Sequence, residues 1–134
     1  MTHYLELEDL LYLISEALRQ EPKSVVRDWG ELESALHRPR STVFGVDAYP
    51  ALDEKAAALL HSLARNHPLL DGNKRLAWLA ARLFYAYNGR DLKAPDARTA
   101  DALIRDVAAG KHDADRLAEV LRCWGAEAQQ RLEQ

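Results

Sequence analysis

Cysteine is almost absent from the sequence, and long apolar runs are absent altogether. One cysteine, Cys123, in 134 residues excludes a disulfide framework and a zinc site built from several cysteines, and we interpret it as a packing residue of the last helix. No apolar run is long enough to span a bilayer, and the N-terminus lacks the basic and apolar regions of a signal peptide. These absences predict a cytoplasmic protein without a membrane partner.

A strong excess of one charge is also missing. The formal net charge is −3 and the pI is about 5.9, so bulk electrostatics give no reason to expect direct binding of nucleic acid. Internal repeats and low-complexity tracts are not found either. With 48% apolar and 29% charged residues the composition is that of a globular protein, and the length predicts a single domain, residues 1–134.

Helical spacing of apolar residues, in contrast, recurs along the whole chain, and we expect about six helices. Residues 125–134 are expected to form a frayed helical tail. The predicted fold class is therefore all-α, a compact helical bundle. The expected helix starts are Glu8, Asp28, Asp53, Asn73, Pro95-Asp96 and Asp113, and the expected stops are Pro22, Pro39, His67, Gly89 and Gly110.

Residues 40–50 are the clearest exception to the helical spacing, because they are rich in residues that favour extended structure. One interpretation is a loop that packs Phe44 and Val46 into the core. The other is a flap over a site, whose backbone pairs with a segment of a protein target. The flap residues would be Thr42, Val43, Phe44 and Gly45.

One stretch gathers polar side chains between two apolar helical segments: His67-Pro68-Leu69-Leu70-Asp71-Gly72-Asn73-Lys74-Arg75. Pro68 disfavours a helical conformation at His67, so the first helix is expected to stop there and the next to begin at Asn73. A helix start offers unpaired backbone N–H groups and the positive end of the helix dipole, and both favour a bound anion.

The side chains of this stretch indicate a phosphate site. Lys74 and Arg75 place two cations in a first helical turn, where the dipole makes cations unfavourable, and Gly72 lets the backbone approach a ligand closely. Asp71 would repel a phosphate directly, but it could hold Mg²⁺ that bridges to the phosphate oxygens. His67 could then act as general base toward a hydroxyl group.

Each of these residues also has a structural interpretation. Taken alone, His67 would be a helix-terminal histidine bonded to a backbone carbonyl, and Asp71 would be a helix N-cap. Lys74 and Arg75 would be solvent-exposed charges. For Asn73, holding the loop and contacting a phosphate are equally open. Their occurrence together in one short stretch favours the functional interpretation.

The stretch resembles the signature of the Fic/Doc family, whose consensus is roughly His-Pro-Phe-x-(Asp/Glu)-Gly-Asn-Gly-Arg. In the Doc (death-on-curing) branch a lysine replaces the last glycine, as Lys74 does here, while Leu69 stands where phenylalanine is usual. Residues 32–39 and 42–45 are also similar to a segment of Doc-type proteins, and the resemblance covers roughly Leu5 to Gly125.

The resemblance implies an activity, cofactors and partners. Doc-branch members are toxins that transfer the γ-phosphoryl group of ATP to a threonine of translation elongation factor Tu, which implies a Ser/Thr protein kinase that uses ATP and Mg²⁺ and inhibits translation. A cognate antitoxin that folds as it binds is the expected partner. The implied roles are catalytic base for His67, metal ligand for Asp71, and phosphate binding for Gly72, Asn73, Lys74 and Arg75.

Two other functions remain open at this stage. Adenylylating Fic proteins transfer AMP to a hydroxyl group, and Gly72 is Fic-like because the best-known Doc sequences have alanine at that position. A non-catalytic interaction domain that has kept the fold is the third possibility.

Overall fold

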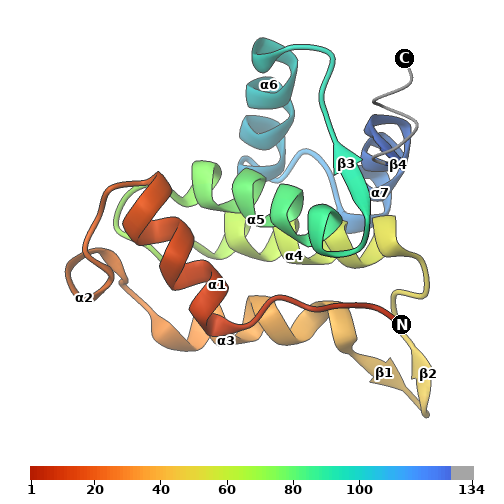
Figure 1. Cartoon of the computed structure of the whole chain (residues 1–134), viewed down its shortest axis with the longest axis horizontal. Helices are drawn as coiled ribbons and strands as arrows, with labels where there is room; N and C mark the ends of the chain where they lie inside the picture. The colour runs from red at the N-terminus through yellow and green to blue at the C-terminus, as the bar shows by residue number, and fades with distance from the viewer. Residues whose placement is uncertain (128–134) are drawn as a thin grey trace.

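Seven α-helices dominate residues 1–127, the part of the chain that the computed structural model describes (Figure 1). The predicted all-α class is confirmed, and no helix within these residues is long and apolar enough to cross a membrane. A π-helical turn, Leu13–Ala17, extends α1, and a 3-10 turn, Arg38–Arg40, extends α3. The helices are α1 (Leu7–Tyr12), α2 (Pro22–Val25), α3 (Trp29–His37), α4 (Leu52–Asn66), α5 (Asn73–Tyr87), α6 (Ala97–Ala108) and α7 (Ala114–Trp124).

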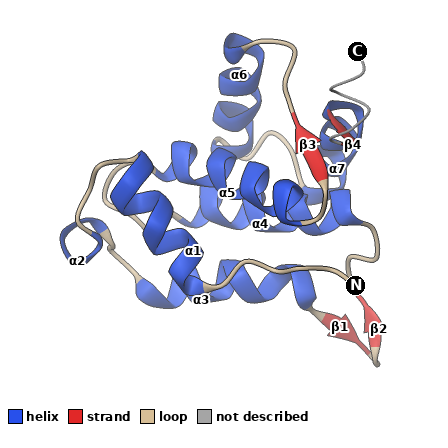
Figure 2. Ribbon diagram, viewed as in Figure 1, coloured by secondary structure: helices blue, strands red, loops and turns tan. Residues whose placement is uncertain are grey.

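Helices α4 and α5 form the centre of the molecule and run in opposite directions (Figure 2). Leu59, Leu60 and Leu63 of α4 and Leu76 and Phe84 of α5 are each at most 1% exposed. Burial of such side chains contributes roughly 1.5–3 kcal/mol each relative to exposure. The loop that joins the two helices, residues 67–72, is therefore fixed at both ends by well-packed elements.

Three of the predicted helix starts are confirmed by N-cap hydrogen bonds. Asp28 accepts from the Glu31 amide at 3.1 Å, Asp96 from the Thr99 amide at 2.7 Å, and Asp113 from the Arg116 amide at 2.8 Å. Pro22, which was predicted to end the first helix, instead occupies the first turn of the short α2, and the first helical segment ends before it, at Ala17.

The predicted N-cap role of Asp53 is wrong. Helix α4 begins at Leu52 after Ala51, and Asp53 lies in its first turn with 6% exposure. Its carboxylate accepts a short hydrogen bond from the Tyr85 hydroxyl and lies 3.6 Å from Arg90 Nη1. A buried carboxylate needs such partners, and they come from distant parts of the chain.

We predict that Tyr85→Phe lowers the free energy of unfolding by about 2 kcal/mol, because it leaves the buried Asp53 carboxylate without its hydroxyl donor. Urea unfolding measures the change. Tyr87→Phe is the matched control, since its hydroxyl donates to Asp9 at 2.6 Å in an exposed pair, and it should cost well under about 1 kcal/mol. Equal losses in the two variants would contradict the buried-pair argument.

The same pair predicts a pH dependence. Burial, and then the hydrogen bond to Asp53, raise the pKa of the Tyr85 phenol well above its usual range. The unfolded chain releases this proton near pH 10 while the folded chain keeps it, so stability falls as the pH rises above that value. Tyr85→Phe should remove this part of the alkaline loss.

Residues 125–127 do not continue as the helical tail that the sequence suggested. Strand β4 (Gly125–Glu127) pairs antiparallel with β3 (Arg90–Leu92), which sequence patterning did not predict. A Cβ at Gly125 would lie 2.8 Å from Tyr85 Cε1, so the close approach requires glycine. The remainder of the expected tail, residues 128–134, lies outside the described residues. Cys123 is exposed, which corrects its interpretation as a packing residue.

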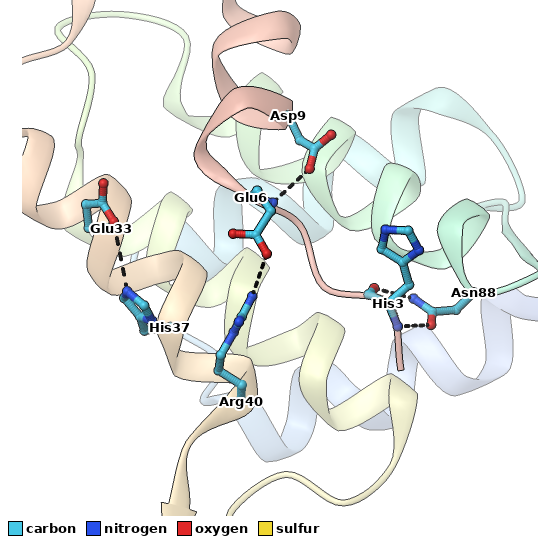
Figure 3. A network of polar contacts seen from close by, with 7 residues as sticks. All are labelled: His3, Glu6, Asp9, Glu33, His37, Arg40 and Asn88. Atoms are coloured by element: carbon cyan, nitrogen blue, oxygen red, sulfur yellow. Dashed lines mark hydrogen bonds and ion pairs between the residues drawn. The ribbon is translucent and has the colours of Figure 1, made fainter. Parts of the chain in front are cut away.

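The N-terminal segment is hydrogen-bonded to the C-terminal end of α5 (Figure 3). Asn88 Oδ1 accepts from the His3 amide at 2.8 Å, and Asn88 Nδ2 donates to the His3 carbonyl at 2.9 Å. Arg40 Nη2 donates to Glu6 Oε1 at 3.3 Å in the same region. These contacts join the first residues of the chain to α5 and to the turn after α3.

Residues 42–47 form a small hairpin, in which β1 (Thr42–Val43) pairs with β2 (Val46–Asp47). The interpretation that this segment packs into the core is wrong, because Phe44 is fully exposed and Val46 is 67% exposed. Only the base is anchored, by the buried Lys55, whose ammonium donates to Asp47 Oδ2 at 3.2 Å and to the Tyr49 carbonyl at 2.6 Å.

Candidate active site

His67 ends helix α4 in the left-handed conformation, with φ 50° and ψ 59°. This agrees with the prediction that the helix stops before Pro68. The left-handed region is uncommon for a residue other than glycine and costs about 1 kcal/mol or more, so the surrounding structure must impose it. The His67 side chain is exposed, and an incoming molecule can reach it.

The loop after His67 is docked onto the segment between α2 and α3. Val26 and Leu69 form a β-bridge, the Leu70 amide donates to the Val25 carbonyl at 2.7 Å, and the Arg27 amide donates to the Pro68 carbonyl at 2.8 Å. Leu69, which replaces the usual phenylalanine, is only 2% exposed. The smaller side chain therefore still anchors the loop in the core.

Asn73 holds the same loop from the other side. Its Oδ1 accepts from the Leu69 amide and its Nδ2 donates to the Leu69 carbonyl, both at 2.8 Å. Asn73 Nδ2 also lies 3.5 Å from His67 Nδ1, which is too long for a strong hydrogen bond. These contacts favour the structural alternative that the sequence left open for Asn73.

Gly72 precedes α5 with φ 92°, and no side chain caps this helix. A Cβ at Gly72 would lie 2.7 Å from Leu18 Cδ2. The positive φ thus favours glycine here, and the end of the Leu18 side chain would have to shift to admit a Cβ. Since no described side chain caps α5, the backbone N–H groups of its first turn have no side-chain acceptor among the described residues.

Lys74 and Arg75 border a groove between α5 and α6. The groove has a volume of about 210 Å³ and is continued by a neighbouring hollow that shares Trp78 with it. Arg75 Nη2 donates to the Ala17 carbonyl at 3.3 Å, while the Lys74 ammonium has no partner among residues 1–127. The groove is lined by Lys74, Arg75, Trp78, Ala97, Ala100, Asp101 and Ile104.

Asp71 is exposed, and within the described part of the chain its carboxylate has no hydrogen-bond or ion-pair partner. Those residues also contain no group of three or more His, Cys, Asp or Glu side chains that could form a complete metal site. Mg²⁺ commonly takes only one or two protein carboxylates and fills its remaining positions with water and substrate phosphates. A single exposed carboxylate such as that of Asp71 is compatible with that pattern.

The residues expected to form a flap are not at this site. The hairpin is anchored to Lys55 in the first turn of α4, whereas His67 follows the last turn of the same helix (Figure 1). A helix of 15 residues is about 22 Å long, so the hairpin and the imidazole lie at opposite ends of α4. The segment that pairs with the motif loop is residues 25–28 instead.

Sequence reasoning missed three contributors to the site: Arg27, Leu18 and Trp78. Trp78 and Leu18 carried no signal, because apolar residues at helical spacing are ordinary core positions. Arg27 had an indirect signal in the sequence. Helix α4 ends without a glycine and before a proline, so its last carbonyl groups need a donor from another segment.

Comparisons with known proteins agree with the motif. The family model described as "Fic/DOC family" matches residues 4–85. A curated relative, "Toxin Doc" of Mycolicibacterium smegmatis, is 52% identical over 130 residues, which cover 96% of this chain and 98% of the relative. With this extent of similarity, and with the motif loop arranged around His67, the chain belongs to the Fic/DOC family.

Proposed function

We propose that this protein is the toxin of a toxin–antitoxin module and a protein kinase that transfers the γ-phosphoryl group of ATP to a Ser or Thr hydroxyl of a translation factor. The relative named Toxin Doc supports the toxin assignment, and membership of a family that transfers phosphate-containing groups to proteins supports the chemistry. Elongation factor Tu, a cytoplasmic protein, is the target that the Doc resemblance favours.

The observation that carries the kinase assignment is the Lys74 ammonium in the first turn of α5, which has no partner among the described residues. In adenylylating Fic proteins glycine at this position leaves room for the α- and β-phosphates. Lys74 occupies that space and adds a positive charge, so the nucleotide should bind in a different position and present its terminal phosphate. Gly72 does not oppose this assignment, because its φ and the nearby Leu18 explain the glycine without reference to the nucleotide.

The chemistry requires one proton acceptor and several positive charges. The target hydroxyl oxygen attacks the γ-phosphorus, the bond from that phosphorus to the β-γ bridging oxygen breaks, and ADP leaves. His67 accepts the hydroxyl proton. Lys74, Arg75 and the uncapped start of α5 offset the negative charge on the phosphate oxygens. Bound with the nucleotide, Mg²⁺ supplies further positive charge, and Asp71 is the residue that would hold it.

The groove beside Lys74 supports a nucleotide as the donor. Its position between α5 and α6 gives the phosphate site an apolar extension, with the Trp78 side chain in both the groove and the adjoining hollow. Apolar and aromatic walls with a few charged groups at one end are typical of nucleotide and cofactor sites. We assign the nucleoside of ATP to this extension.

An antitoxin is the second partner in this proposal. Regulation in trans is favoured because the sequence contains no inhibitory motif of the self-inhibited Fic type. The C-terminal segment of such an antitoxin would fold as it binds, and it would spend part of its binding energy on that ordering. Co-expression of the cognate antitoxin should restore growth to cells that produce this protein.

The test is incubation with Mg·ATP and elongation factor Tu, followed by intact-protein mass spectrometry. An added mass of one phosphate supports the kinase, and an added AMP supports adenylylation. Parallel reactions with α- and γ-labelled ATP identify which phosphorus is retained. No added mass under conditions where the protein arrests translation would overturn both enzymatic assignments for this target.

The hairpin gives a separate prediction. Phe44 has φ 52°, a conformation that Asn tolerates far better than Phe, so Phe44→Asn should leave folding stability unchanged or raise it by up to about 1 kcal/mol. Transfer to the target should stay unchanged, because the hairpin lies at the far end of α4 from His67. Val43→Asn, on the exposed strand beside it, is the matched control. A raised KM for the target in Phe44→Asn alone would restore the flap interpretation.

A further inference from the structure

The C-terminal end of α4 lacks the hydrogen bonds that usually close a helix. A left-handed residue at this position is normally glycine, and the amide that follows it donates back to a carbonyl of the last turn. Here the left-handed residue is His67, and the next residue, Pro68, has no amide hydrogen. The last carbonyl groups of α4 therefore need donors from elsewhere in the molecule.

Arg27 supplies two of these donors. Its Nε donates to the His67 carbonyl at 2.8 Å, and its Nη2 donates to the Asn66 carbonyl at 3.0 Å. The planar guanidinium spans two adjacent carbonyl groups in a way that a lysine ammonium cannot. Its positive charge also lies at the negative end of the α4 dipole, where a cation is favourable.

The backbone of Arg27 is fixed as well. Its amide donates to the Pro68 carbonyl at 2.8 Å, and the Asp28 amide donates to the same carbonyl at 3.1 Å. The bridge between Val26 and Leu69 continues this pairing. Arg27 thus contacts the residues before, at and after the turn that projects the His67 imidazole, although it is 40 positions away in the sequence.

We propose that Arg27 is a positioning residue for His67: its guanidinium replaces the missing helix cap and holds His67 in the left-handed conformation that aims the imidazole at the substrate. The kinetic part of this inference rests on the proposed function. Arg27 is exposed, so the bonds add little to global stability. Their effect is on the orientation of the His67 imidazole. Small misplacements of a catalytic group can reduce a rate by about 10²-fold.

The structural test uses Arg27→Gln and the NMR signals of the histidine rings. The chain has 5 histidines, and loss of one ring signal in His67→Gln assigns His67. In Arg27→Gln the His67 ring signals should move toward those of an unfolded histidine, while the other four keep their positions. Arg27→Lys should move them less, since it keeps the charge but loses the two-point contact.

Arg65→Gln is the matched control. Arg65 also donates from its guanidinium to a helix-terminal carbonyl, that of Ala108, at 2.9 Å, and it is likewise exposed. The Arg65→Gln substitution should leave the NMR signals of His67 and the rate of group transfer unchanged. Arg27→Gln should lower kcat about tenfold or more with the KM for ATP unchanged, and thermal unfolding should shift equally little in both variants.

The outcomes separate the two proposals. If the parent protein transfers neither phosphate nor AMP, the proposed function fails, and the NMR comparison still decides the role of Arg27. If the His67 signals of Arg27→Gln coincide with those of the parent, the positioning role is overturned whatever the activity. If Arg65→Gln disturbs them equally, the effect is a general loss of helix-end contacts and the proposal also fails.

Discussion

His67→Ala is expected to lower kcat for group transfer by about 10²–10⁴-fold, the usual contribution of a general base. The substrate hydroxyl would have to lose its proton to water, because the described residues offer no second imidazole at the motif loop. The KM for ATP should change little, since the phosphate contacts assigned to Lys74 and Arg75 remain. Steady-state kinetics with γ-labelled ATP measures both quantities.

The loss should come from the missing base and not from altered folding. His67 is exposed and its only side-chain hydrogen-bond contact with a described residue is the long one to Asn73, so its truncation should leave the core intact. His37→Ala is the matched control, because His37 is also an exposed histidine at a helix end, and its side chain pairs with Glu33 alone among the described residues, at 3.9 Å. Growth arrest by His67→Ala equal to that of the parent would rule out catalysis by this residue.

The sequence predicted the parts of the site that depend on neighbouring residues. Pro68 marked the end of α4, and Asp28, Asp96 and Asp113 marked helix starts, because capping involves residues within one turn of each other. The motif loop was predicted for the same reason. Its glycine and its two cations lie at a helix start, which is itself a local feature.

Contacts between distant segments were not predictable from the same patterns. Asp53 resembled an N-cap because its partner Tyr85 lies 32 positions away, and a buried carboxylate has no signature in periodicity. Strands β3 and β4 are each of 3 residues and pair across two helices, so neither shows an alternating pattern. The position of the hairpin at the far end of α4 was not predictable either, because extended segments do not reveal which end of a neighbouring helix they approach.

Lys74→Gly is expected to have the second large effect, a change of product. Removing the ammonium should lower phosphate transfer by about 10²-fold, comparable with the loss of one preorganised charge at a transition state. The space that the lysine side chain occupied would then accept the α- and β-phosphates, and the attacking hydroxyl would meet the α-phosphorus. The product would carry AMP, and pyrophosphate would leave.

Lys74→Met separates the two contributions of the lysine. It removes the charge but keeps most of the volume, so it should lose phosphate transfer without gaining AMP transfer. Glycine in the first turn of α5 costs at most about 1 kcal/mol of helix stability, which thermal unfolding of both variants will detect. Mass spectrometry of the target distinguishes the products. If Lys74→Gly still yields only phosphorylated target, at the rate of the parent protein, then other residues set the position of the nucleotide. The groove lined by Trp78 would be the first place to look for those residues.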